Sequence, residues 1–363
     1  MTGARSGASS GRVDRLLRAL DREPVDATPI WFMRQAGRSL PAYRRIRERA
    51  SLADIVGDAA LCAEVSIQPV DLLGVDAAIV FADITTPLAG IGVEVELIEG
   101  VGPVIERPIS DVADLDVLRA FDAEEAVPAL LEAISILRRE SPVPVIGFAG
   151  APFTVAAYLI EGRSPRELAR TKAMMHRDPV AWDGLLARLV DVDLAYLRAQ
   201  VRAGAQVIQV FDSWAGQLSP YDYRVSVLPY MRRLFEGLAE LGVPTIHFGT
   251  GTAGLLEAMT EAGGDAIGLD WRIPLADGWA RVGTRAIQGN LDPQSLLGTW
   301  DATAAQAHWI LDQAAGRAGH VFNLGHGVLP ATDPDHLRRL VDLVHERSLD
   351  DAEAQPRFAA VPA

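Results

Sequence analysis

The chain has 363 residues, of which 49% are hydrophobic and 23% charged, and its formal net charge is -14. This composition predicts a globular protein with a large core, and the acidic balance argues against a nucleic-acid partner, which needs a basic surface. The single cysteine, Cys62, excludes a disulfide framework and a multi-cysteine metal cluster. No apolar run reaches the roughly 18 residues of a membrane helix, and no signal-peptide pattern opens the chain, so we expect a cytoplasmic protein without a membrane partner.

Short runs of β-favouring residues, bounded by turn residues, recur along the chain and predict strands. Most are apolar throughout, as expected of parallel strands covered on both faces. Helical patterns such as residues 183–204 and 229–242 separate most of them, and several end on a glycine. The eight runs are residues 28–34, 77–83, 143–150, 205–213, 243–249, 265–271, 285–292 and 320–326.

Eight strand–helix repeats predict an α/β protein in which residues 13–348 form a single (β/α)8 TIM barrel, since right-handed crossovers favour that closure. An open doubly wound sheet is the alternative. It usually carries G-x-G-x-x-G after its first strand, whereas the stretch here is RQAGRS. Residues 84–108 predict a β-hairpin inserted after the second strand. The ends, 1–12 and 349–363, lack a core pattern and predict a flexible arm and a flexible tail.

Barrel enzymes place their chemistry where strands end and the following loops begin. Most predicted strands end on a polar residue or a glycine, which strand ends facing only a core would not need. We therefore expect a functional mouth at this end of the barrel. The positions are Arg34, Asp83, Gly150, Ser213, Gly249, Trp271, Asn290, Asp292 and His326.

The first predicted strand leads into a cluster of positive charge. Residues 28–49 contain six arginines against one acidic residue, Glu48. A run of arginines is usually a solvated helix face. We assign that interpretation to three of the six, Arg44, Arg45 and Arg49.

For Arg34, Gln35, Arg38 and Arg47 we favour anion binding over a solvated face. Arg34 directly follows an apolar strand, and Gly37 permits close approach of a ligand to the backbone. Planar guanidinium groups suit carboxylates, to which they donate paired, charge-assisted hydrogen bonds. The cluster therefore predicts a site for a ligand that carries carboxylates.

Other strand ends carry further candidates, each with a structural alternative. Asp83 is either a helix N-cap or a carboxylate that faces a cationic intermediate. Ser213 is a cap or a ligand contact, and without a G-x-S-x-G elbow it is not a nucleophile. His326 lies between glycines in NLGHG, which favours access over packing, while Tyr158 has the pattern of a core aromatic. We expect no metal site, since H-E-x-x-H and C-x-x-C are both absent.

Six segments, in this order, resemble the uroporphyrinogen decarboxylase family: PIWFMRQAGR, FADITTP, GFAGAPFTVAAYLIEG, QVFDSWAG, GNLDP and NLGHGVLPATDP. The resemblance covers residues 13 to about 347, nearly the whole chain. Ser39 stands where the family usually has an aromatic residue, and Ala42 where it often has an acidic one; neither is a contact position.

This resemblance implies a single (β/α)8 barrel that forms homodimers and uses no metal or organic cofactor. It implies loss of the carboxyl groups from the four acetate side chains of uroporphyrinogen III, which gives coproporphyrinogen III and CO2. Matching the motifs puts catalysis on Asp83, Arg34 and His326. The substrate contacts implied are Arg34, Gln35, Ala36, Gly37, Arg38, Arg47, Asp83, Tyr158, Ser213 and His326.

A macrocycle with eight carboxylates and four central pyrrole N–H groups needs arginines at its rim and an acceptor at its centre, which Arg34, Arg38, Arg47 and Asp83 would supply. The proton donor stays open between Arg34, implied by the resemblance, and His326, whose ordinary pKa is better matched. Two alternatives also remain. One is a zinc-dependent methyltransferase acting on corrinoid proteins, from the same superfamily, and the other is a tetrapyrrole carrier without catalysis.

Overall fold

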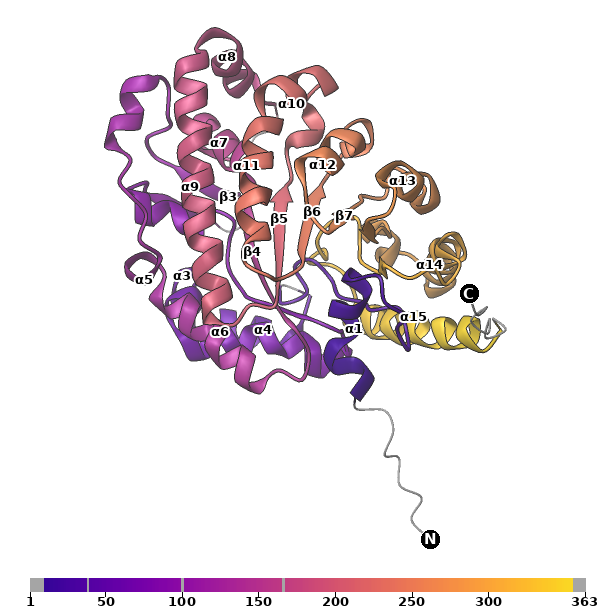
Figure 1. The fold of residues 1–363 in the computed structure, drawn as a ribbon. Helices are drawn as coiled ribbons and strands as arrows, with labels where there is room; N and C mark the ends of the chain where they lie inside the picture. The colour runs from indigo at the N-terminus through magenta and orange to yellow at the C-terminus, as the bar shows by residue number, and fades with distance from the viewer. Residues whose placement is uncertain (1–9, 38, 99–100, 165–166, 355–363) are drawn as a thin grey trace.

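The computed structural model describes residues 10–37, 39–98, 101–164 and 167–354. Within these ranges, seven parallel strands form one curled sheet at the centre of the molecule, in the order β1-β4-β5-β6-β7-β8-β9, with helices on its outer side (Figure 1). The strands are β1 Ala78–Ile79, β4 Val145–Gly150, β5 Val207–Asp212, β6 Thr245–Gly249, β7 Ala266–Gly268, β8 Ala286–Gln288 and β9 His320–Val321. Every residue of β4 is buried, as expected of a parallel strand that is covered on both faces.

Each strand of this sheet lies inside a predicted run, so seven of the eight predicted strands are confirmed. The helices are α1 Ser10–Leu20, α2 Pro41–Arg47, α3 Leu52–Gly57, α4 Ala59–Leu73, α5 Ala123–Ala126, α6 Pro128–Glu140, α7 Pro152–Glu161, α8 Ala169–Arg177, α9 Pro179–Ala203, α10 Pro220–Ser226, α11 Leu228–Ala239, α12 Leu256–Ala262, α13 Leu275–Val282, α14 Trp300–Ala314 and α15 Pro334–Ala354. The described part of the chain also contains 3₁₀-helices, η1 Thr86–Ile91, η2 Val112–Val117, η3 Ala215–Gln217, η4 Thr252–Gly254 and η5 Pro293–Leu297.

The first predicted strand, residues 28–34, is reduced to a single parallel bridge between Ile30 and Phe322. The Ile30 carbonyl also accepts a hydrogen bond of 2.8 Å from the Asp76 backbone N–H, so this segment lies between the β9 side and the chain entering β1. Regular pairing stops because the Phe32 N–H donates to the Gln35 side chain, and Arg34 adopts a left-handed backbone. The predicted strand was therefore too long.

Residues 84–108, predicted as a hairpin, contain a separate two-stranded sheet. Its strands, β2 Val95–Ile98 and β3 Gly102–Ile105, pair antiparallel, with Val95 opposite Ile105. The Ile105 N–H donates to the Gly162 carbonyl at 2.8 Å, and the Ile109 N–H to the Leu159 carbonyl at 2.9 Å. These bonds attach the segment to the end of α7.

The helices at both ends extend beyond the predicted boundaries of the arm and the tail. Helix α1 begins at Ser10, and the Arg12 guanidinium donates to the carbonyls of Val70 at 3.2 Å and Val75 at 2.8 Å. Helix α15 continues to Ala354. The predictions for residues 1–9 and 355–363 lie outside the described residues.

A buried ion network lies at the amino end of the sheet. Asp76 is fully buried, and its carboxylate bonds to Arg15 at 2.7 Å, to His345 at 2.7 Å and to the Ile30 N–H at 2.8 Å. Arg15 also forms a two-pronged pair with Asp26. This network joins α1 and α15 to the strand entrance, on the side of the sheet opposite the expected mouth.

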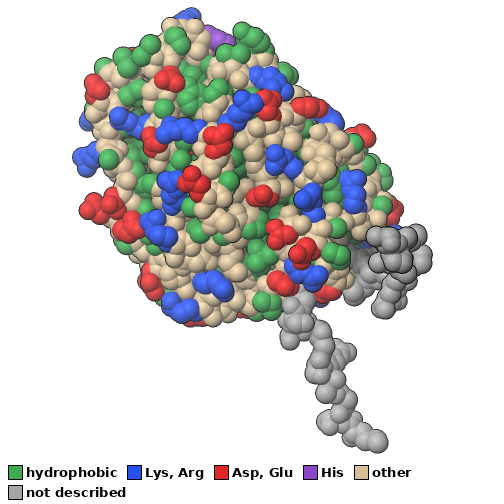
Figure 2. Space-filling view, in the orientation of Figure 1, with side chains coloured by type: hydrophobic (Ala, Val, Ile, Leu, Met, Phe, Trp, Pro, Cys, Tyr) green, Lys and Arg blue, Asp and Glu red, His purple; other side chains and the backbone are tan. Residues whose placement is uncertain are grey.

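Basic and acidic side chains alternate over the face in Figure 2, with no single-sign field across it. Among the described residues, no helix is long and apolar enough to cross a membrane.

Candidate active site

The predicted site residues lie at the carboxyl ends of neighbouring strands. Asp83 follows β1, Tyr158 lies on the helix after β4, Ser213 directly follows β5, and His326 comes shortly after β9. Arg34 ends the segment that bridges to Phe322, directly after β9. Since parallel strands end at one edge of a sheet, these residues share that edge.

Arg34 has a backbone φ of 59°, in the left-handed region that residues with a Cβ rarely adopt. Such a conformation costs on the order of 1–3 kcal/mol and persists only where its surroundings impose it. Here the Val328 N–H bonds to the Met33 carbonyl at 2.8 Å, and a Cβ at Gly327 would lie 2.5 Å from the Arg34 Cδ. The strained backbone therefore lays the Arg34 side chain across Gly327, beside His326, with the side chain exposed.

His326 is partly buried, and its Nδ1 accepts a hydrogen bond of 2.6 Å from the Gly327 N–H. Burial, and then the charges of Arg34 and Arg272, lower the pKa of His326 from 6.5 to about 4. The ring is therefore neutral at pH 7, and because Nδ1 is an acceptor, the proton lies on Nε2. In the free protein His326 is a hydrogen-bond donor and not a cationic acid.

Tyr158 connects this group to the next strand ends. Its ring lies 6.2 Å from that of Trp214, which follows Ser213. Burial raises the pKa of Tyr158, the nearby Asp83 carboxylate raises it further, and the Arg34 guanidinium opposes the change. Asp83, Arg34 and Tyr158 thus lie within range of one another's charge.

The Asp83 carboxylate is held in one orientation. Its Oδ1 accepts hydrogen bonds from the Thr85 N–H at 2.9 Å and from the Thr85 hydroxyl at 2.6 Å. Within the described chain, its Oδ2 has no protein hydrogen-bond partner. The local turn therefore fixes one oxygen, which is the N-cap-like role considered from the sequence, and leaves the other as an acceptor.

The sequence predicted Gln35 as a ligand contact, but its side chain bonds to the protein's own backbone. Its side chain is fully buried, accepts from the Phe32 N–H at 3.0 Å and donates to the Ala77 carbonyl at 2.8 Å. The side chain therefore shapes the turn, and only its backbone remains a candidate contact. Ala36 is also buried, and a Cβ at Gly37 would lie 3.0 Å from the Arg34 carbonyl oxygen, so the turn leaves little room for a larger residue there.

The remaining predicted contacts are less closely connected to this group. The Ser213 carbonyl accepts from the Thr250 hydroxyl at 2.6 Å, in the loops after β5 and β6. Arg47 ends α2 and donates to the Ala50 carbonyl at 2.6 Å. The pKa of Asp54 is lowered mainly by hydrogen bonds from Ser51, and the nearby charge of Arg47 lowers it further. Arg38 lies outside the described residues.

The chain is similar to known proteins over nearly its whole length. The model of the family described as uroporphyrinogen decarboxylase (URO-D) matches residues 12–347. The chain belongs to the uroporphyrinogen decarboxylase family. A curated relative named uroporphyrinogen decarboxylase from Thermus thermophilus is 52% identical over 335 residues, which cover 92% of this chain and 98% of the relative. One of the same name from Streptomyces coelicolor is 51% identical over 334 residues, with 92% and 94% covered.

The fold also matches a solved methyltransferase from Methanosarcina mazei, with a TM-score of 0.75 over 93% of this chain and 99% of that one. Their identity is 22%, so the likeness concerns the fold alone. Cys62, the only thiol, is a poor zinc ligand here: burial raises its pKa to about 12, and its Sγ donates to the Phe81 carbonyl. Within the described ranges, no three His, Cys, Asp or Glu side chains are grouped so as to hold a metal ion. The methyltransferase alternative is therefore not favoured.

Two residues at the same edge, Asp270 and Arg272, were missed from the sequence, where the strand end GLDWR gave only Trp271 as a position. Asp270 is buried and pairs with the Arg272 guanidinium, which also stacks 4.0 Å over the Trp271 ring. The signal was an acidic, an aromatic and a basic residue in succession at a strand end. No known motif marked it.

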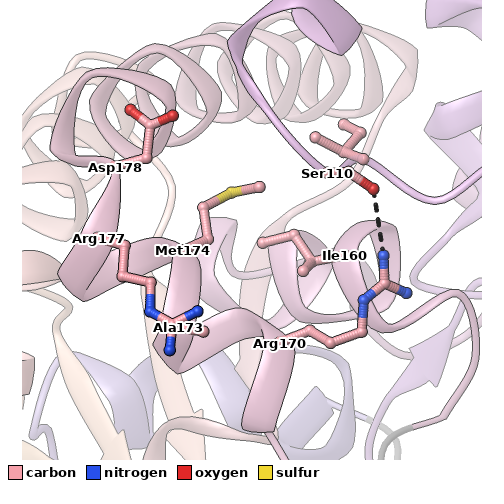
Figure 3. A pocket seen from close by; sticks show the side chains of 8 residues that line it. Ser110, Ile160, Arg170, Ala173, Met174, Arg177 and Asp178 are labelled. Atoms are coloured by element: carbon pink, nitrogen blue, oxygen red, sulfur yellow. Dashed lines mark hydrogen bonds between the residues drawn. The ribbon is translucent and has the colours of Figure 1, made fainter.

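Two cavities of the structure lie away from this edge. The first, about 280 Å³, lies between α7 and α8 and is lined in part by Ile160, Met174 and Arg177, with Arg170 donating to the Ser110 hydroxyl at 3.3 Å (Figure 3). Ile160 lies two positions after Tyr158, so these side chains point to nearly opposite sides of α7. The second, about 600 Å³, is lined by Thr245 and Asp265 at the amino ends of β6 and β7. Neither cavity contains Arg34, Asp83 or His326.

Proposed function

We propose that this chain is a uroporphyrinogen decarboxylase, which removes the four acetate carboxyl groups of uroporphyrinogen III as CO2 and gives coproporphyrinogen III. The observation that carries the proposal is that about half of the residues are identical to those of curated enzymes of that name, over nearly the full length of those enzymes. The grouping of Arg34, Asp83, Tyr158 and His326 at one edge of the sheet supports it.

Substrate binding divides the roles by charge. Arg34, with Arg38 and Arg47, would hold carboxylates at the rim of the macrocycle, since each charge-assisted bond contributes about 1.5–3 kcal/mol. The Oδ2 of Asp83 would accept hydrogen bonds from the central pyrrole N–H groups. The Nε2–H of His326 and the backbone of residues 35–37 would complete the contacts.

The chemistry requires an electron sink for each leaving carboxylate. Protonation of the pyrrole ring carbon makes an iminium-like cation, which takes up the electron pair when the C–C bond to CO2 breaks. No organic cofactor or metal is then required. An aspartate about 4 Å from that cation stabilises it by roughly 4 kcal/mol at an effective dielectric of 20, or nearly a thousandfold in rate.

Arg34 and His326 are the two candidate proton donors. A guanidinium with a pKa above 12 is a weak acid, and His326 is neutral at pH 7 in the free chain. A bound polyanion favours the imidazolium and raises the His326 pKa again. The pH profile of kcat for His326→Asn decides between them, because an unchanged profile removes histidine as the donor.

We also propose, as the family implies, a cytoplasmic homodimer whose barrel is completed by residues 29–31 in the eighth strand position. Hydrogen bonds support that position: on one side the Phe322 N–H donates to the Pro29 carbonyl at 2.8 Å, and on the other the Asp76 N–H donates to the Ile30 carbonyl. Residues 13–348 would then form one catalytic domain. Sedimentation at micromolar concentration tests the dimer.

An anaerobic assay with enzymatically made uroporphyrinogen III tests the function. We expect species with seven, six, five and four carboxyl groups in succession, and four CO2 released per macrocycle. A carrier would bind the macrocycle and release no CO2. A methyltransferase would hold stoichiometric zinc and leave the carboxyl count at eight. Either outcome would overturn the proposal.

A further inference from the structure

We propose that Arg272 binds a carboxylate of the substrate, as a specificity-determining residue near His326; this inference rests on the proposed function. Arg272 follows β7 by four positions, at the carboxyl edge of the sheet. The turn that carries it abuts the segment of His326, since a Cβ at Gly325 would lie 2.5 Å from the Trp271 nitrogen. Arg272 thus belongs to the same edge as Arg34, approached from another strand.

The charges around His326 indicate where the guanidinium lies. After burial, the two positive charges that lower the His326 pKa are Arg34 and then Arg272, and Asp270 opposes them. Two arginines, from chain segments that are far apart in the sequence, therefore lie close enough to act on the charge of His326. A negatively charged group placed at His326 would be attracted by both.

Arg272 is held in position before any ligand arrives. Its Nη1 pairs with the Asp270 carboxylate, its backbone N–H donates to the Asp270 Oδ1 at 3.1 Å, and its guanidinium stacks 4.0 Å over Trp271. Asp270 is itself fixed, because it accepts from the Gly251 N–H at 2.5 Å and its carbonyl accepts from the Asn290 side chain at 2.9 Å. Ordering a long side chain in advance lowers the entropy cost of binding.

The pair with Asp270 leaves donors for a ligand. A guanidinium has five N–H groups, and 51% of the Arg272 side chain is exposed, whereas the Asp270 side chain is 1% exposed. Within the described chain, Asp270 is the only acceptor paired with this guanidinium. The exposed donors suit a carboxylate, and the substrate of the proposed reaction carries eight.

The test measures binding of uroporphyrin, the oxidised octacarboxylate, by fluorescence titration of the full-length protein. Arg272→Gln should raise the Kd about tenfold, the lower end expected for a charge-assisted bond made by a half-exposed group. It should raise KM for uroporphyrinogen by a similar factor. Arg272→Lys should weaken binding less, because it keeps the charge.

Two further variants separate ligand binding from a structural role. Arg339→Gln is the matched control, since Arg339 stacks over Trp300 at 4.1 Å on outer helices, and its Kd should equal that of wild type. Asp270→Asn removes the charged partner of Arg272 and keeps the positive charge of Arg272, so uroporphyrin binding should weaken less than in Arg272→Gln. Equal losses in Asp270→Asn and Arg272→Gln would show that only the ion pair matters, and would overturn the proposal.

The wild-type protein separates this inference from the proposed function. If it decarboxylates uroporphyrinogen and Arg272→Gln binds uroporphyrin with wild-type affinity, the role of Arg272 is wrong and the function stands. If the wild-type protein neither binds nor decarboxylates, the proposed function fails, and this inference with it.

Discussion

Replacing Gly327 with alanine tests whether Arg34 acts from the position that the structure gives it. The new Cβ would lie 2.5 Å from the Arg34 Cδ, 2.7 Å from its Cγ and 3.1 Å from its Cβ. Contacts under 3.0 Å cannot persist, so the arginine must leave its place. Gly327 itself does not have a left-handed backbone, so an alanine fits the main chain without strain.

The size of the effect follows from the bonds that Arg34 would lose. One or more charge-assisted hydrogen bonds to substrate contribute about 1.5–3 kcal/mol, so kcat/KM should fall about 10- to 150-fold. The assay compares kcat/KM for uroporphyrinogen in wild type and Gly327→Ala, with urea unfolding of both. We expect an unchanged unfolding midpoint.

Gly254→Ala is the control, because Gly254 also lies shortly after a strand, at the end of η4, and has no atom within 4 Å of the point that a new methyl group would occupy. It should keep wild-type kcat/KM. If Gly327→Ala is equally active, the placement of Arg34 against Gly327 does not matter to function, and the reasoning from the strained backbone is refuted.

Three further predictions concern charge. Asp83→Asn should lower kcat about a thousandfold with the fold intact, and near-normal turnover by the folded variant would exclude the cation-stabilising role. His320 is buried and its pKa is lowered to about 4, so the unfolded chain binds more protons between pH 6.5 and 4. The contribution of the neutral His320 ring to the free energy of unfolding is therefore complete above pH 6.5 and is lost as the pH falls to 4. In urea unfolding, the free energy of unfolding should fall by about 3 kcal/mol more in wild type than in His320→Gln between these pH values. Asp76→Ala removes the buried carboxylate that Arg15, His345 and the Ile30 N–H share, and should cost about 3–5 kcal/mol of unfolding free energy. Asp335→Ala, in an exposed ion pair, should leave the midpoint unchanged.

The sequence predicted the strand core well because each strand is a continuous apolar run, as in Val145–Gly150 and Val207–Asp212. It failed at residues 28–34, where β-favouring residues suggested a full strand. The Gln35 amide diverts the Phe32 N–H, and Arg34 turns into a left-handed backbone. Both effects depend on partners beyond the local stretch, such as the Ala77 carbonyl, and no local propensity encodes them.

The sequence predicted which strand ends carry the candidate site, but it did not predict the protonation states of the residues there. An ordinary histidine pKa made His326 look like a ready acid, whereas burial beside Arg34 and Arg272 lowers that pKa to about 4. The order of those arginines in the sequence, 238 positions apart, gave no indication that they share a neighbour. The sequence pattern also showed Tyr158 only as a buried aromatic residue, and gave no sign that its hydroxyl lies near the charges of Asp83 and Arg34.

The most direct test of the central claim is a crystal structure of the protein with coproporphyrinogen bound under anaerobic conditions. We predict that the pyrrole nitrogens lie within hydrogen-bonding distance of the Asp83 Oδ2 and that carboxylates contact Arg34. A macrocycle bound elsewhere, for example in the cavity beside Arg170 and Arg177, would contradict the account.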